Sequence, residues 1–135
     1  MVLRGACLAY YVCVGSALAA TSDERAREMA ECGYLAHMAV QQMKTLPDRP
    51  AVYDDVVTDV IDFINLYYHL SDLEKPVDGL GINGEMLYVT ANAGKAIHDA
   101  RTRAMSPQNA LKLSNRVLDT CRSDLDMFAQ KLKIR

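Results

Sequence analysis

Apolar residues along most of the chain recur every three or four positions, which is the period of an amphipathic α-helix. Four such segments follow one another, over about residues 21–45, 51–70, 84–105 and 107–132. Segment 51–70 is rich in Val, Ile and Tyr, which favour strands, but its apolar residues keep the helical period and do not alternate by two. The pattern therefore predicts an all-α protein.

Each predicted helix has one apolar face, which we expect to point inward. In the first two helices these faces comprise Ala26, Met29, Gly33, Ala36, Val40 and Met43, and then Tyr53, Val56, Val57, Val60, Ile61, Ile64 and Tyr67. In the last two they comprise Met86, Val89, Thr90, Ala93, Ile97 and Ala100, and then Ala110, Leu111, Ser114, Val117, Leu118, Cys121, Leu125, Phe128 and Leu132. Four such helices with mostly short joints are typical of an antiparallel four-helix bundle, and a less regular helical array is the alternative.

Proline, asparagine and serine mark where the helices begin and end. Pro47 and Pro50 end the first helix, because proline lacks the backbone N–H that a helix interior needs. Asn83 is the expected N-cap of the third helix. Ser106 followed by Pro107 is a hydroxyl cap with proline at the first helical position, so the fourth helix should begin there.

The first twenty residues differ from all that follow. Arg4 supplies one positive charge, residues 5–20 contain no acidic or basic side chain, and the run ends in Ala17-Leu18-Ala19. Its apolar part is about sixteen residues long, short of the roughly twenty that span a bilayer. We expect a secretory signal peptide over 1–19, leaving 20–135 as a single all-α domain that is periplasmic or secreted. A buried first helix or a membrane anchor is the alternative.

Charge is unevenly distributed along the remaining chain. Without Arg4, 14 basic and 17 acidic side chains remain, which argues against a nucleic-acid binder. Asp55, Asp59 and Asp62 lie at i, i+4 and i+7, so they should share one face of the second helix. We expect this acidic face to be exposed and to dock a protein partner with a basic surface. Alternatively it is solvated, or a basic helix of the same bundle covers it.

Two of the four cysteines, Cys32 and Cys121, lie outside the predicted signal peptide. In an exported protein two cysteines are usually paired. The first and last helices of a bundle are natural neighbours, so we expect a disulfide between them. Two buried free thiols are the alternative.

Motifs that carry chemistry are missing from the sequence. His37, His69 and His98 lie on three different helices, and no E-x-x-H pair accompanies them. The chain also has no C-x-x-C, no G-x-S-x-G and no recognisable nucleophile-and-base set. We therefore expect no enzyme, no cofactor and no metal. The sequence favours an exported binding protein acting by surface complementarity. The alternative is a bundle that holds a metal or small ligand in its core through His37, His98 or the tyrosines.

A signal peptide, an early cysteine in the first helix, a helical body and a late cysteine in the last helix form a recognisable layout. It resembles that of small exported bacterial helical proteins, some of which are periplasmic immunity proteins against secreted toxins. The resemblance spans the mature chain and is carried by Cys32 and Cys121 alone. It implies an inhibitor-like or immunity-like role toward a protein partner.

Overall fold

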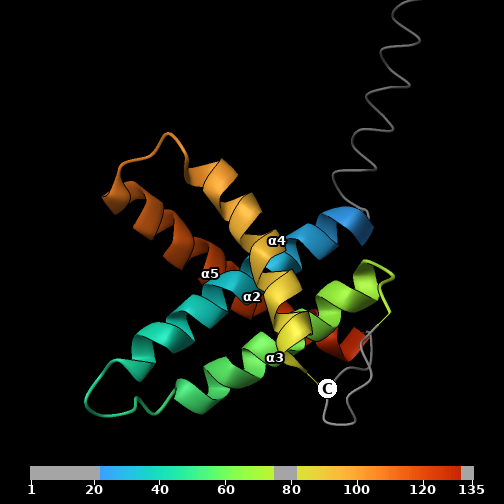
Figure 1. The fold of residues 1–135 in the computed structure, drawn as a ribbon, viewed down its shortest axis with the longest axis horizontal. Helices are drawn as coiled ribbons and strands as arrows, with labels where there is room; N and C mark the ends of the chain where they lie inside the picture. The colour runs from blue at the N-terminus through green and yellow to red at the C-terminus, as the bar shows by residue number, and fades with distance from the viewer. Residues whose placement is uncertain (1–21, 75–81, 132–135) are drawn as a thin grey trace, which may run out of the picture.

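The computed structural model describes residues 22–74 and 82–131, most of which belong to four α-helices (Figure 1). These are α2 (Ser22–Lys44), α3 (Tyr53–Leu70), α4 (Gly84–Thr102) and α5 (Pro107–Lys131). No strand occurs in either described stretch, so the all-α prediction is confirmed. The predicted signal peptide over 1–19 lies outside the described residues.

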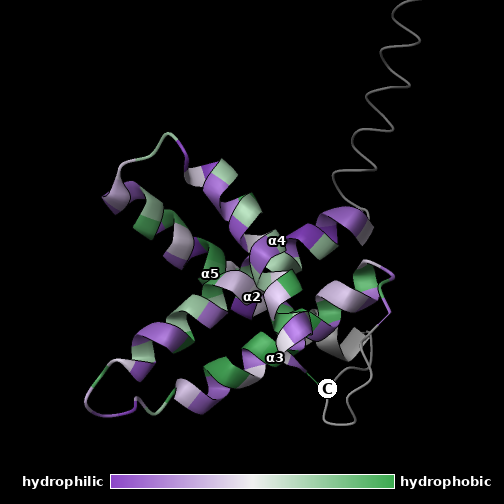
Figure 2. Cartoon of the chain, viewed as in Figure 1, coloured by the Kyte–Doolittle hydropathy of each residue, from purple (hydrophilic) through white to green (hydrophobic). Residues whose placement is uncertain are grey.

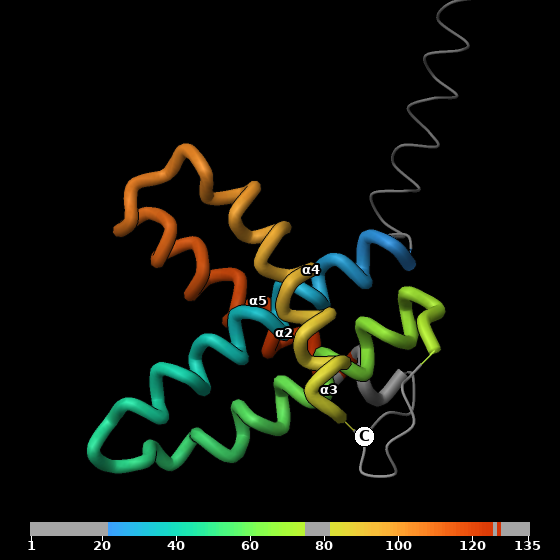
Figure 3. Tube along the Cα trace, viewed as in Figure 1, coloured from blue at the N-terminus to red at the C-terminus, as the bar shows by residue number. Residues whose placement is uncertain are grey.

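The four helices form two hairpins that cross (Figures 1 and 3). The first hairpin consists of α2 and α3, and the second consists of α4 and α5. α2 lies at the crossing and packs most extensively against α3 and α4, while α5 crosses both α2 and α3. The arrangement is the less regular helical array rather than four helices aligned side by side. None of the described helices is long and apolar enough to cross a membrane.

Two of the predicted helix starts are formed as expected. The Asn83 side chain accepts a hydrogen bond from the backbone N–H of Met86 at 2.9 Å, which is the N-cap of α4. Ser106 Oγ accepts one from the backbone N–H of Asn109 at 3.3 Å, at the start of α5. Both bonds satisfy a backbone donor that the first helical turn leaves unpaired.

The apolar core draws residues from all four helices, and Figure 2 shows hydrophobic and hydrophilic residues interspersed along each of them. Its largest fully buried side chains are Met29, Phe63, Ile64, Leu66, Met86 and Leu125. The predicted inward face of α2 is buried, apart from the half-buried Met43. Ala30, Cys32 and Leu35 are buried as well, because helices pack on α2 from several sides.

The crossing also changes which residues of the other helices are covered. In α3, Phe63 and Leu66 are fully buried, whereas Ile61, which was expected inside, is 41% exposed. In α4, Val89 is exposed, although the helical period of the apolar residues predicted that it points inward. In α5, Leu111 is 60% exposed. The helical period marks a wide apolar face on each of these helices, and the neighbouring helices cover only part of that face.

Candidate functional site

The two cysteines of the described chain form a disulfide that ties α2 to α5. Their Sγ atoms are 2.04 Å apart and their Cα atoms 5.8 Å apart, within the range of protein disulfides. Cys32 and Cys121 are both buried. The predicted pairing is therefore confirmed, and with it the contact between the first and last helices.

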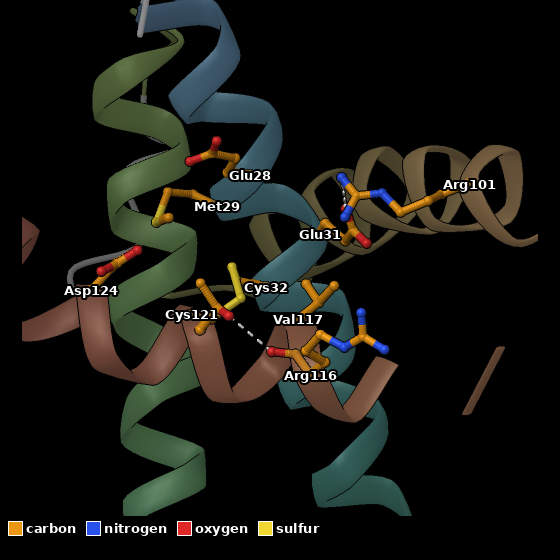
Figure 4. A pocket seen from close by; sticks show the side chains of 10 residues that line it. Glu28, Met29, Glu31, Cys32, Arg101, Arg116, Val117, Cys121 and Asp124 are labelled. Atoms are coloured by element: carbon orange, nitrogen blue, oxygen red, sulfur yellow. Dashed lines mark hydrogen bonds and ion pairs between the residues drawn. A yellow bond between two sulfur atoms is a disulfide. The ribbon is translucent and has the colours of Figure 1, made fainter. Parts of the chain in front are cut away.

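A buried carboxylate lies one residue before this disulfide. Glu31 is only 1% exposed, and a buried charge is costly unless it is paired. Its Oε1 lies 3.1 Å from Nδ1 of His98, and its Oε2 lies 3.0 Å from a guanidinium nitrogen of Arg101. Figure 4 shows Arg101 reaching Glu31 from α4. His98 and Arg101 are three residues apart on α4, so the same helical face presents both donors.

The other ring nitrogen of His98 contacts α5. Its Nε2 lies 2.9 Å from Oγ of Ser114. Ser114 Oγ is also 2.9 Å from the backbone carbonyl oxygen of Ala110, one helical turn earlier. Arg101, Glu31, His98 and Ser114 thus form one polar chain through three helices, which we call the Glu31–His98–Ser114 network.

Two cavities lie on opposite ends of this network. The first, of about 250 Å³, borders the disulfide and includes Glu31, Arg101 and Arg116 in its lining (Figure 4). The second, of about 200 Å³, includes His98 and Ser114, and we call it the Ser114 groove. Its other lining residues are Tyr34, Leu35, Met38, Ala39, Gln42, Leu111, Asn115 and Leu118. The Ser114 groove therefore combines mostly apolar walls with a polar end.

The histidines do not converge on a metal site. His37 lines a third cavity with side chains of α3, His98 belongs to the network, and His69 is exposed near the end of α3. Burial, followed by the charge of Lys44, lowers the pKa of His37, so its imidazole is neutral near pH 7. Within 22–74 and 82–131, no three histidine, cysteine or carboxylate side chains group closely enough to hold a metal ion.

The expected acidic docking face on α3 is not formed. Asp55 is exposed, but Asp62 is buried at 7% exposure. Asp59 is half-buried, and its carboxylate lies 3.6 Å from the guanidinium of Arg122 on α5. The three side chains therefore do not share an exposed face, since Asp62 is covered and α5 brings Arg122 to Asp59.

Sequence reasoning missed the Glu31–His98–Ser114 network. Its members are separated by 67 and 16 positions, so no local motif contains them. One signal was present in the sequence: Ser114 is a hydroxyl in the apolar face predicted for the last helix. A polar side chain inside an apolar face needs a partner, and His98 flanks the apolar face of α4.

Comparison with known proteins identifies no relative: no family model, no curated protein and no solved structure matches the chain. The resemblance to small exported helical proteins therefore rests only on the layout of two cysteines and four helices. The geometry of the cavities and of the polar network is what supports a function.

Proposed function

We propose that this chain is an exported helical binding protein, inhibitor-like or immunity-like, that takes an apolar side chain of a protein partner into the Ser114 groove. The observation that carries the proposal is a pair of exposed apolar side chains on two helices that line one groove. Met38 of α2 is 40% exposed and Leu111 of α5 is 60% exposed, and both line the cavity. Exposed apolar residues grouped around a concavity are typical of interaction sites.

The size of the groove favours one side chain over a drug-sized molecule. Its volume is about 200 Å³, whereas pockets for drug-sized ligands usually begin at about 300 Å³. Protein interfaces concentrate binding energy where an apolar anchor fills a well-packed pocket. One large aliphatic or aromatic side chain of a partner suits the groove in this way.

The disulfide supports export, since disulfides persist in oxidising compartments outside the cytosol. A periplasmic or secreted location also agrees with the signal peptide predicted for 1–19. In that setting an immunity-like protein would meet its partner after both had left the cytosol.

Site-specific photo-crosslinking tests the proposal. A photoreactive residue is placed at Leu111 in the groove and, as a control, at Tyr88, which is 70% exposed on α4 and does not line the groove. In cells that produce the protein natively, position 111 should yield one defined protein adduct and position 88 none. Adducts of equal yield at both positions, or none at 111, would contradict the proposal.

Purified partner then allows a quantitative test with substitutions at the same positions. Leu111→Glu places a charge in the groove and should weaken binding at least about tenfold, or about 1.4 kcal/mol. Tyr88→Glu should leave the Kd unchanged. Far-UV circular dichroism checks that both variants remain helical.

A further inference from the structure

Glu31, His98 and Ser114 have the relative positions of a carboxylate, a base and a nucleophile. His98 Nδ1 is 3.1 Å from Glu31 Oε1, and its Nε2 is 2.9 Å from Ser114 Oγ. Arg101 contacts the other carboxylate oxygen, Oε2, which leaves Oε1 to orient the imidazole ring. Such a set is recognised by geometry and roles rather than by order in the sequence.

The hydrogen bonds also determine where the serine proton lies. A carboxylate only accepts hydrogen bonds, so with Glu31 ionised Nδ1 of His98 carries a hydrogen. In neutral His98, Nε2 is then an acceptor, and Ser114 donates its hydroxyl proton to it. In protonated His98, Nε2 donates instead, and the hydroxyl turns to the Ala110 carbonyl oxygen, which lies at the same 2.9 Å. Neutral His98 thus has the tautomer that a general base for Ser114 requires.

The Ser114 groove gives this hydroxyl access to a small substrate. Ser114 is half-buried and lines the cavity together with the buried His98, whereas Glu31 is not among the lining residues. The apolar walls include Leu35, Leu111 and Leu118, which suit a short acyl chain. Asn115, an exposed residue that follows Ser114 in the chain, also lines the groove, and a side-chain amide can donate N–H groups to an oxyanion.

We propose that Ser114, His98 and Glu31 form a hydrolytic triad that cleaves short-chain carboxylic esters in the Ser114 groove. This activity goes beyond partner binding and does not depend on it. Ser114 Oγ attacks the ester carbonyl carbon while His98 Nε2 accepts its proton. The carbon–oxygen bond to the alcohol then breaks, and the alcohol leaves with that proton. Water, deprotonated by His98, attacks the acyl-serine, and the acid leaves as His98 returns the proton to Ser114.

An alkyl fluorophosphonate probe, which forms a bond with activated serines, tests this on the full disulfide-bonded chain. Tandem mass spectrometry should place the adduct on Ser114. Ser123 is the matched control, because it lies on the same helix and donates its hydroxyl to the backbone carbonyl of Thr120 instead of facing a histidine. Ser123 should stay unlabelled. Because this measurement uses the unaltered protein, its outcome does not depend on the folding of a variant.

Hydrolysis of p-nitrophenyl butyrate provides the second readout. Ser114→Ala should abolish the release of p-nitrophenolate above the background rate, while Ser123→Ala should keep the rate of the unaltered protein. His98→Gln, if it keeps the circular dichroism spectrum, should lose both turnover and labelling at Ser114. No adduct at Ser114 in the folded protein, or labelling at the same rate after unfolding in urea, would overturn the triad. Neither result bears on the crosslinks at Leu111, so the two proposals fail separately.

Discussion

Glu31 is an ionisable side chain placed where nearly all neighbouring positions of α2 are buried. It is tolerated there because α4 brings two cationic or hydrogen-bonding groups to its two oxygens. Removing one partner of a buried pair costs far more than the pair contributes, since the remaining charge stays buried. The side chain of Arg101 is 45% exposed, so solvent screens part of its attraction to Glu31.

Arg101→Met should therefore lower the free energy of unfolding by about 1–3 kcal/mol, because it keeps the aliphatic stem and removes the charge facing Glu31. Urea denaturation of the variant and the unaltered protein measures the effect. Arg103→Met, an exposed position on the same turn of the chain, is the control and should change little. Equal effects at 101 and 103 would show that the buried ion pair contributes nothing to stability.

At the scale of the helices, local sequence signals predicted that helices form and at which residues two of them begin. The helical period, the Asn83 cap and the Ser106-Pro107 start all correspond to structure. The faces were predicted less well, because periodicity records how apolar a face is and not which helix will cover it. Ile61 and Leu111 are apolar but exposed, while Asp62 is polar but buried. These differences follow from the crossing of the two hairpins, which no segment encodes alone.

The crossing depends on a close approach of α4 to α2 at Gly94. A Cβ atom at this position would lie 2.0 Å from the backbone oxygen of Ala30, well inside van der Waals contact. Because the contacted atom belongs to the α2 backbone, it cannot move aside as the end of a flexible side chain could. Glycine at 94 thus lets α4 pack directly on the α2 backbone, which also places His98 and Arg101, one and two turns later, beside Glu31.

Gly94→Ala should lower the free energy of unfolding by about 1–3 kcal/mol, since the cost of overpacking outweighs the better helix propensity of alanine. Gly84→Ala is the matched control, because a Cβ there meets nothing within 4 Å. That variant should be as stable as the unaltered protein or slightly more stable. Thermal denaturation followed by circular dichroism compares the two. A stable Gly94→Ala variant would mean that α4 can shift away from α2 at little cost.

At the scale of the whole molecule, the disulfide closes the chain between its first and last described helices. α5 packs less extensively on the rest of the domain than α3 or α4 does on α2. It is held by the apolar contacts of Leu125 and its neighbours, by the Ser114–His98 hydrogen bond and by the bond from Cys121 to Cys32. The covalent bond therefore has its largest effect on the position of α5.

Cys32→Ala together with Cys121→Ala should lower the free energy of unfolding by about 4–5 kcal/mol in the chain-entropy model; the cysteines are 89 positions apart in the chain. Such a loss is a large part of the 5–15 kcal/mol that is typical of a domain. Urea denaturation measures it, and adding a reductant should destabilise the unaltered protein while leaving the double variant unchanged. If the denaturation midpoint is the same with and without the bond, non-covalent packing alone fixes α5.

Hydrogen exchange of the double variant tests which part of the domain the bond holds in place. α5 makes the fewest contacts with the other helices, so its backbone amides should exchange faster than those of α2 and α3. If α2 and α3 lose protection together with α5, the domain opens as one unit.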